Sequence, residues 1–320
     1  MNGFAFEGGA YAFHNNLFDS AGQRAMGYYD QTQLNYYYFL AAQFGISDRW
    51  FSPLMAKSEP NHLFEFAATS QGWVDIPTVQ LSAPTIFNLL QHAGVSWKIY
   101  YIDVTKATGR PDTFAGYFSK LNAFSTNVVP ISQYFTDVQN GTLPAVALVE
   151  AGRESGGSSE HPQDNVQVGA KQVESVVDAL LKSSSWSSSV FILTWDEGGG
   201  LYDHVPPLAS VNPDGIPVNI SPEPFIKSTF NDNFTYTGFR VPVIVISPFS
   251  KKGYVSHTPA DYTAILKLIE TRFNLPNLTK RDAAQFDMTE FFDFANAPNA
   301  TPPAPPAQFM NAPCYFNSLP

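Results

Sequence analysis

The sequence predicts an α/β fold in which a mostly parallel sheet is covered by helices on both faces. Three apolar runs, at 144–149, 189–195 and 241–247, have the length of a strand and lack the alternation of a half-exposed one. Segments with helical periodicity lie around them, the clearest at 165–181. Strands without alternation that are separated by helices are typical of a buried parallel sheet. Ligands bind such sheets beyond the carboxyl ends of the strands, so the residues that follow each strand are the first candidates for a site.

The first part of the chain has a mixed pattern. Residues 1–30 are rich in glycine and aromatic residues without any period, so we expect a loop there. Residues 31–44 have apolar side chains at helical spacing, and a second helix is expected within 82–94, with proline near its first turn and glycine after its end. Residues 97–102 predict a short strand. Residues 103–142 predict a loop-rich insertion with a short helix.

The second part is more regular. The helix at 165–181 has one apolar stripe, and residues 261–273 predict another helix, whereas the prolines of 201–238 indicate a loop. Residues 297–320 are rich in proline and alanine and predict a tail lying on the surface. We therefore expect one domain over residues 1–296 followed by this tail.

Composition limits the function classes. The chain has 320 residues, of which 44% are hydrophobic and 14% charged, so most of it is expected to fold. With 18 Lys and Arg against 28 Asp and Glu, and a net charge of −10, it lacks the basic face that nucleic-acid binding requires. No apolar run approaches the roughly 20 residues that span a bilayer, and no secretory signal opens the chain. The single cysteine, Cys314, excludes an internal disulfide and a cysteine-rich zinc site.

The densest group of chemically active residues follows the strand that ends near Trp195. Two acids, Asp196 and Glu197, precede three glycines, and Asp203 and His204 come next. Carboxylate oxygens suit hard cations and histidine suits zinc-like ones. The alternative is a polar turn with solvated acids. Four potential ligands within nine residues, at the edge where the fold places ligands, favour a functional site.

Other candidates have simpler alternatives. Glu160 and His161 follow a strand and precede a long helix, although a histidine in a loop is usually a surface residue. His257 also follows a strand, and the alternative is local packing in the first turn of a helix. Ser58 precedes an expected helix at 63–67, where a serine usually caps the helix, yet the free N–H groups of a helix start also hold anions.

Together these segments resemble the phosphoesterase family that contains phosphatidylcholine-cleaving phospholipases C and certain bacterial acid phosphatases. The matching segments occur in the family's order: Met26-Gly27-Tyr28-Tyr29-Asp30, Ser47-Asp48-Arg49-Trp50-Phe51, Pro60-Asn61, Glu160-His161-Pro162, Asp196-Glu197-Gly198-Gly199-Gly200-Leu201-Tyr202-Asp203-His204-Val205-Pro206-Pro207 and Gly253-Tyr254-Val255-Ser256-His257-Thr258. The resemblance implies an alkaline-phosphatase-like fold and hydrolysis of phosphate esters through a phosphorylated Ser or Thr.

The resemblance also implies roles for individual residues. Ser58 matches the nucleophile, which also contacts a divalent metal ion of unknown identity, and Asp196 and Glu197 match the metal ligands. His161 matches a histidine that could protonate the leaving group. Candidate substrate-binding residues are Asn61, His62, His204 and His257, and Asp203 and Glu160 are weaker candidates.

Two departures from the family pattern stand out. His62 occupies the position of the family's arginine, and an imidazole lacks the bidentate phosphate donor of a guanidinium. The family's opening strand and its Glu-Asn-Arg-Ser-Phe-Asp-His motif have no counterpart in these 320 residues. We therefore expect that the chain is truncated at its amino end relative to the family and that the first sheet strand is missing.

Two functions remain open at this stage. The first is a secreted or periplasmic hydrolase, by resemblance, that acts on a phospholipid headgroup or a soluble phosphomonoester. The many aromatics, such as the run Tyr36 to Phe39, would suit a lipid, although core packing explains them better. The second is a non-catalytic member that keeps the fold and lacks a complete metal site.

Overall fold

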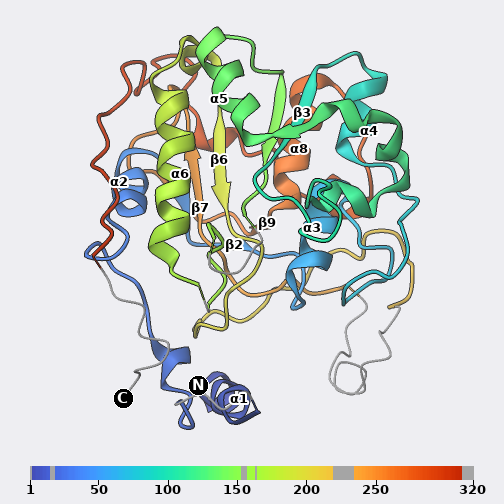
Figure 1. Cartoon of the computed structure of the whole chain (residues 1–320), viewed down its shortest axis with the longest axis vertical. Helices are drawn as coiled ribbons and strands as arrows, with labels where there is room; N and C mark the ends of the chain where they lie inside the picture. The colour runs from blue at the N-terminus through green and yellow to red at the C-terminus, as the bar shows by residue number, and fades with distance from the viewer. Residues whose placement is uncertain (1, 15–18, 153–156, 163, 219–233, 312–320) are drawn as a thin grey trace.

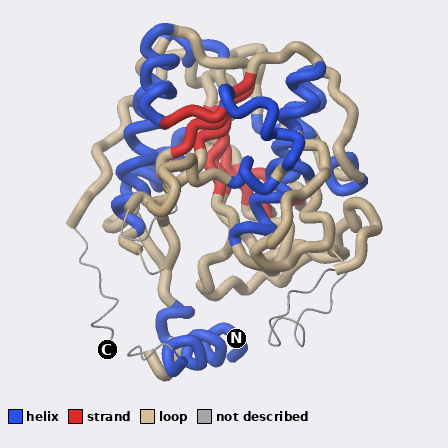
Figure 2. Tube along the Cα trace, turned by 45° about the vertical axis from the view of Figure 1, so that its right-hand side comes forward, coloured by secondary structure: helices blue, strands red, loops and turns tan. Residues whose placement is uncertain are grey.

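The computed structural model describes residues 2–14, 19–152, 157–162, 164–218 and 234–311, and these form an α/β fold (Figure 1). The predicted fold class is therefore confirmed. Within this part of the chain the strands form three sheets, with orders β6-β7-β1-β8, β2-β9 and β4-β3-β5. Figure 2 shows the strands in the interior, with helices and long loops around them.

The strands and helices expected after residue 30 each have a counterpart with similar bounds, and several short elements that were not expected are also present. The strands are β1 Gly45–Ser47, β2 Trp50–Phe51, β3 Trp97–Tyr101, β4 Val128–Pro130, β5 Val146–Val149, β6 Phe191–Thr194, β7 Val243–Ile246, β8 Val255–Ser256 and β9 Ala260–Asp261. The α-helices are α1 Asn2–His14, α2 Asn35–Gln43, α3 Ser58–Ala67, α4 Ile86–His92, α5 Ile131–Asn140, α6 Val166–Leu181, α8 Thr263–Phe273 and α9 Lys280–Ala283. Short 3-10 helices are η1 Gln23–Met26, η2 Phe114–Tyr117, η3 Ser119–Asn127, η4 Ser184–Ser188 and η5 Thr289–Phe291.

The four-stranded sheet is mixed, which corrects the expectation of a parallel neighbour for the strand at 241–247. β7 runs antiparallel to both β6 and β1, whereas β8 is parallel to β1. A parallel neighbour needs a crossover, usually a helix, but antiparallel strands do not. The antiparallel pairing of β7 with β6 therefore needs no crossover helix.

The faces of this sheet are covered by different helices. Alternate residues of a strand point to opposite faces, and in β7 Ile244 and Ile246 pack with α2 and α6 on one face. Val243 and Val245 pack on the other face with side chains from α3 and α8. All four β7 side chains are buried, as the sequence pattern predicts.

The sheet β4-β3-β5 is entirely parallel. Ile99 of β3 packs with α3, α4 and α8, whereas the next residue, Tyr100, packs with α5 and α6 on the opposite face. β5 and β6 are both edge strands, and most of their side chains are half-buried rather than fully buried as expected. The α6 helix covers both sheets and holds these two edges near each other (Figure 1).

Two segments differ from the sequence prediction. Residues 2–14 form the helix α1 instead of a loop. The side of α1 that packs against residues 20–22 consists of small residues, so it does not form the apolar stripe that predicts a helix. A Cβ on Gly9 would lie 2.6 Å from the carbonyl oxygen of Ser20. The insertion at 103–142 has more regular structure than expected, including β4 and the ten-residue helix α5.

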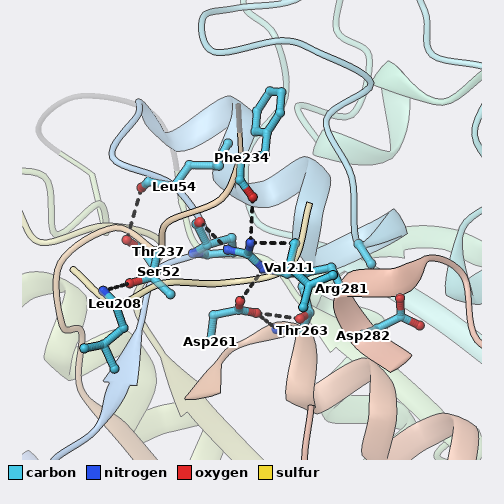
Figure 3. A network of polar contacts seen from close by, with 12 residues as sticks. Ser52, Leu54, Leu208, Val211, Phe234, Thr237, Asp261, Thr263, Arg281 and Asp282 are labelled. Atoms are coloured by element: carbon cyan, nitrogen blue, oxygen red, sulfur yellow. Dashed lines mark hydrogen bonds and ion pairs between the residues drawn. The ribbon is translucent and has the colours of Figure 1, made fainter. Parts of the chain in front are cut away.

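A buried arginine joins four segments that lie around the start of α3. Arg281 is fully buried, and its Nε donates to Asp261 Oδ2 at 2.7 Å. Its remaining nitrogens donate to the carbonyl oxygens of Val211, Phe234 and Pro53 at 2.8–3.1 Å (Figure 3). Pro53 lies in the turn that leads into α3, so this network fixes the backbone just ahead of Ser58.

The end of the described chain lies along the surface. Gln308 donates to the carbonyl oxygen of Gln33, and its backbone N–H donates to Glu174 of α6. Residues 297–311 contain no helix or strand, as expected, and the rest of the predicted tail, with Cys314, is outside the described residues. None of the described helices has the length and apolar character needed to cross a bilayer.

Candidate active site

Most of the candidate residues lie at one end of the four-stranded sheet, where three of its strands terminate. β6 and β1 are both antiparallel to β7 and therefore point the same way, and β8 is parallel to β1. Their carboxyl ends meet at one edge, where Asp196 follows β6, Asp48 follows β1 and His257 follows β8. The candidate residues therefore lie beyond the carboxyl ends of these three strands, as in a parallel sheet, although this sheet is mixed.

Ser58 is brought to this edge by α3. It is the first residue of the helix, and the N-cap is Lys57, which has no side-chain capping bond. The Ser58 hydroxyl donates to Glu197 Oε1 at 3.1 Å. The capping alternative considered for Ser58 is therefore not what the structure shows, since its hydroxyl is directed to a carboxylate 139 residues away.

The two acids after β6 create an electrostatically strained pair. Burial raises the pKa of Glu197 to about 7, and the neighbouring charge of Asp196 adds to the increase, while the hydrogen bond from Ser58 opposes it. The main-chain oxygen of Asp196 accepts from the hydroxyl of the buried Tyr262 at 3.3 Å, which fixes the backbone at the strand end. Two carboxylates this close together, one of them partly buried, are both charged only if a cation lies nearby.

His62 lies on the same helix and faces Asp196. Its Nδ1 is 2.7 Å from Glu65 Oε2, and its Nε2 is 3.8 Å from Asp196 Oδ2. Phe114 stacks on the ring, with centroids 3.7 Å apart and planes at 15°. Burial alone would lower the pKa of His62, but the hydrogen bond and charge of Glu65 outweigh it, so the pKa is raised. The neighbouring acids therefore favour the protonated form of His62.

Asn61 differs from its expected role in substrate binding. The side chain is fully buried, accepts from the backbone N–H of Leu54 at 3.0 Å and donates to the carbonyl oxygens of Leu54, Ala56 and Lys57. All of its polar atoms are used within the turn that precedes Ser58. We therefore assign Asn61 to holding this turn rather than to contacting substrate.

Glu160 and His161 reach the same region from the loop after β5. The Glu160 carboxylate accepts from Trp195 Nε1 at 2.7 Å and from the hydroxyl of Tyr37. Trp195 directly precedes Asp196, so Glu160 connects its loop to the end of β6. His161 is exposed, and Pro162 lies 3.5 Å from the position of a Cβ on Gly199. A Cβ would fit at this distance, so the positive φ of Gly199, 64°, rather than the approach of Pro162, favours glycine there.

Asp203 and His257 belong to a second group of charged residues. Both Asp203 oxygens accept from Arg240, at 2.6 and 2.8 Å, and Arg240 also donates to the main-chain oxygen of Asp48. Burial would raise the pKa of Asp203, but its hydrogen bonds with Arg240 outweigh this and lower it. His257 Nδ1 lies 2.9 Å from Asp48 Oδ2. His204 points to solvent, 3.9 Å from Asp203.

The donor set partly fits a hard divalent cation. Asp196 and Glu197 offer carboxylate oxygens and Ser58 a hydroxyl, and a cation would offset both the burial and the repulsion from Asp196 that raise the pKa of Glu197. Within the described residues, however, no three His, Cys, Asp or Glu side chains gather as a metal site would require. The described residues thus hold only part of a coordination sphere.

Sequence reasoning missed several residues that shape the site. Glu65 lies three positions after His62, a spacing that places two side chains on one helical face and could have suggested the pair. Phe114 and Arg240 lie in loops far from the motifs, and no local pattern marks them.

The site of this α/β fold combines a serine at a helix start with two acids at a strand end and a neighbouring histidine. This combination is typical of hydrolases. The chain belongs to the Phosphoesterase family, whose family model matches residues 2–276.

Relatives in this family carry informative names. Phospholipase C B of Mycobacterium tuberculosis is 34% identical over 314 residues, which cover 87% of this chain and 58% of the relative. Non-specific phospholipase C1 of Arabidopsis thaliana is 31% identical over 93% of this chain and 56% of the relative. The chain therefore spans somewhat more than half the length of these relatives. A solved protein of the alkaline phosphatase superfamily from Vibrio parahaemolyticus is 14% identical, with a TM-score of 0.46 over 78% of this chain and 63% of that one.

Proposed function

We propose that this protein hydrolyses phosphate esters and that Ser58 is the nucleophile. The observation that carries the proposal is the hydrogen bond of the Ser58 hydroxyl to Glu197, made at a helix start where a serine would otherwise cap the helix. Membership of the Phosphoesterase family and relatives named phospholipases C support the same chemistry.

The proposed reaction has two steps, and Ser58, Glu197 and His161 take part in both. Ser58 Oγ attacks phosphorus, its proton passes to Glu197, and the ester P–O bond breaks as His161 gives a proton to the leaving oxygen. Water then attacks the phosphoserine, gives a proton to His161 and releases phosphate or a phosphorylated headgroup, while Glu197 returns the first proton to Ser58. In the metal-free site, a pKa of about 7 lets Glu197 both accept and return a proton near neutral pH.

Asp196, Glu197 and Ser58 are the residues that would hold a divalent cation. When bound, such a cation neutralises phosphate charge and lowers the pKa of the attacking hydroxyl. His62, fixed by Glu65 and Phe114, contributes a further positive charge toward the phosphate. The acidic chain can bind an anionic ester because these charges are concentrated at one place.

The first test compares two serines with different structural roles. Ser58→Ala removes the nucleophile but no helix cap, so turnover per folded molecule should fall by several orders of magnitude with little loss of stability. Ser183→Ala is the matched control. The Ser183 side chain caps η4, so this variant should lose about 0.5–2 kcal/mol of stability and keep its turnover. Near-parental turnover by Ser58→Ala would remove Ser58 from the mechanism.

The second test addresses the cation. The double variant Asp196→Asn, Glu197→Gln should bind less divalent metal in elemental analysis after dialysis and should lose activity with it. Unchanged metal content together with unchanged activity would contradict the proposal for these two acids.

The substrate class is part of the proposal. We propose a phospholipid-type phosphodiester over a soluble phosphomonoester, because both relatives described above are named phospholipases C. Comparing turnover of an aryl phosphocholine with that of an aryl phosphate tests this choice. A secreted or periplasmic location is proposed on the family resemblance alone.

A non-catalytic binding role is the second candidate. It is favoured by the incomplete donor set, since the described residues hold two acids and a hydroxyl without a third His, Cys, Asp or Glu. This role predicts that a phosphate ester binds and is not turned over, and that Ser58→Ala leaves its affinity unchanged.

A further inference from the structure

The segment that contains α1 and η1 has two chemically different faces. We call residues 2–14 and 19–29 the aromatic cap. Small residues form its inner face: Gly8 and Gly9 of α1 lie against the turn that contains Gly22, and Ala12 is fully buried. Gly22 has φ 65°, and a Cβ there would lie 1.8 Å from the carbonyl oxygen of Ala5. The inner face is therefore closely packed.

The outer face presents large apolar side chains to solvent. Tyr28, Phe13 and Phe6 are 83%, 75% and 72% exposed, the three highest values among the large hydrophobic residues that the structure describes. Phe6 and Phe13 are seven residues apart, two turns of the helix, so they share one side of α1. Contiguous exposed apolar patches mark interaction sites, and Phe6 and Phe13 on one side of α1 are the start of such a patch.

The aromatic cap is attached to the loop that carries the site acids. Phe4 makes edge-to-face contacts with Tyr202 and Phe239, at centroid distances of 5.5 and 5.0 Å. The backbone N–H of Tyr202 donates to the carbonyl oxygen of Ala25. Tyr202 directly precedes Asp203 and follows the glycine run after Glu197, so the aromatic cap is anchored to the loop that joins the site acids to Asp203. Both views show α1 projecting at this end of the molecule (Figures 1 and 2).

Charge identifies the kind of surface that fits the aromatic cap. The described helix α1 contains Glu7 as its one residue among Asp, Glu, Lys and Arg, and the whole chain has a net charge of −10. Helices that bind anionic membranes carry several Lys and Arg, whereas the whole aromatic cap contains only Arg24, against Glu7 and Asp19. Phenylalanine suits the acyl boundary and tyrosine the headgroup level of a bilayer. An electrically neutral, zwitterionic lipid surface matches this combination.

We propose that the aromatic cap docks the protein on a zwitterionic phospholipid surface and so presents the site to the headgroups. The proposal rests on the proposed function for its biological meaning, although docking itself does not require catalysis. Phe6 and Phe13 enter the acyl boundary, Tyr28 lies at the headgroups, and the Phe4 contacts keep the site next to the surface.

The experiment measures binding to phosphatidylcholine vesicles by flotation, in a Ser58→Ala background that preserves the vesicles. The cap variant Phe6→Ser, Phe13→Ser, Tyr28→Ser should bind at least tenfold more weakly than its parent. The control variant Ile76→Ser, Val79→Ser, Phe294→Ser changes three side chains that are also exposed and should bind like the parent. Circular dichroism establishes that both variants are folded.

Activity separates this proposal from the proposed function. With Ser58 restored, the cap variant should lose hydrolysis of vesicle lipid at least tenfold and keep turnover of a soluble aryl phosphocholine within about twofold. If the soluble ester is not turned over by any form, the proposed function fails while vesicle binding still tests the cap.

Three results would overturn docking on a neutral bilayer. The first is equal vesicle binding by the cap and control variants. The second is binding that appears only when phosphatidylglycerol is added. The third is a dimer, seen by light scattering, that the cap substitutions dissociate, because the outer face would then bind a second copy of the chain.

Discussion

Replacing Arg281 should destabilise the protein more than any other single change outside the candidate site. Arg281→Met removes the hydrogen bond to Asp261 and three bonds to the carbonyl oxygens of Val211, Phe234 and Pro53. Asp261 is itself buried and would remain as an unpaired charge. Breaking a buried ion pair by removing one partner costs about 3–5 kcal/mol.

The expected loss translates into a measurable shift in melting temperature. An unfolding entropy of about 2.1 cal/mol/K per residue gives roughly 0.7 kcal/mol per kelvin for a chain of 320 residues. The Tm of Arg281→Met should therefore fall by about 4–8 °C in calorimetry. The exposed Arg272 provides the control, and Arg272→Met should change the Tm by less than about 1 °C.

A double variant tests the physical cause. Arg281→Met, Asp261→Asn removes the unpaired charge and should be more stable than Arg281→Met alone, since much of the loss comes from Asp261 without its partner. A Tm loss below about 2 °C for Arg281→Met would refute the reasoning. So would a double variant whose losses simply add.

Two further predictions concern buried polar groups. Burial, together with hydrogen bonding and repulsion from Asp282, raises the pKa of Glu270 to about 8 from its ordinary 4.5. The unfolded chain releases this proton at lower pH, so its contribution to stability should fall as pH rises from about 4.5 to about 8. Glu270→Gln should flatten that slope in urea titrations at several pH values, and an unchanged slope would contradict the assignment. Asn61→Ala should lower stability by about 2–4 kcal/mol, because it leaves buried backbone groups near Leu54 unpaired. The KM of this variant should stay within about twofold of the parental value. A large rise in KM would show that Asn61 contacts the substrate.

The sequence predicted secondary structure best where the hydrophobic period records burial directly. The helix at 165–181 has an apolar stripe and an asparagine before it, and the structure begins α6 after Asn165, whose side chain caps the helix. The run at 241–247 predicted a fully buried strand, and β7 is one. In both cases the signal lies within one segment, so no knowledge of its neighbours was needed.

Other features depend on neighbours that the local pattern does not record. The helix α1 was missed because close packing of its glycines against residues 20–22, rather than an apolar stripe, holds it. The direction of β7 was missed because strand length and hydrophobicity are the same for parallel and antiparallel pairing. Asn61 was assigned to substrate because a motif gives residue identity without stating which way a side chain points.

By itself, the sequence determined the fold class and the identity of the acids, the serine and the histidines, since composition, period and motifs are properties of the chain. Only the tertiary structure decided that Ser58 donates to Glu197 and that His62 lies between Glu65 and Asp196. It also decided that Phe4 of α1 packs on Tyr202, in the loop that follows the site acids. The physical reason is that contacts between distant residues depend on how α3, β6 and α1 pack, and packing depends on the whole set of neighbours rather than on any one segment.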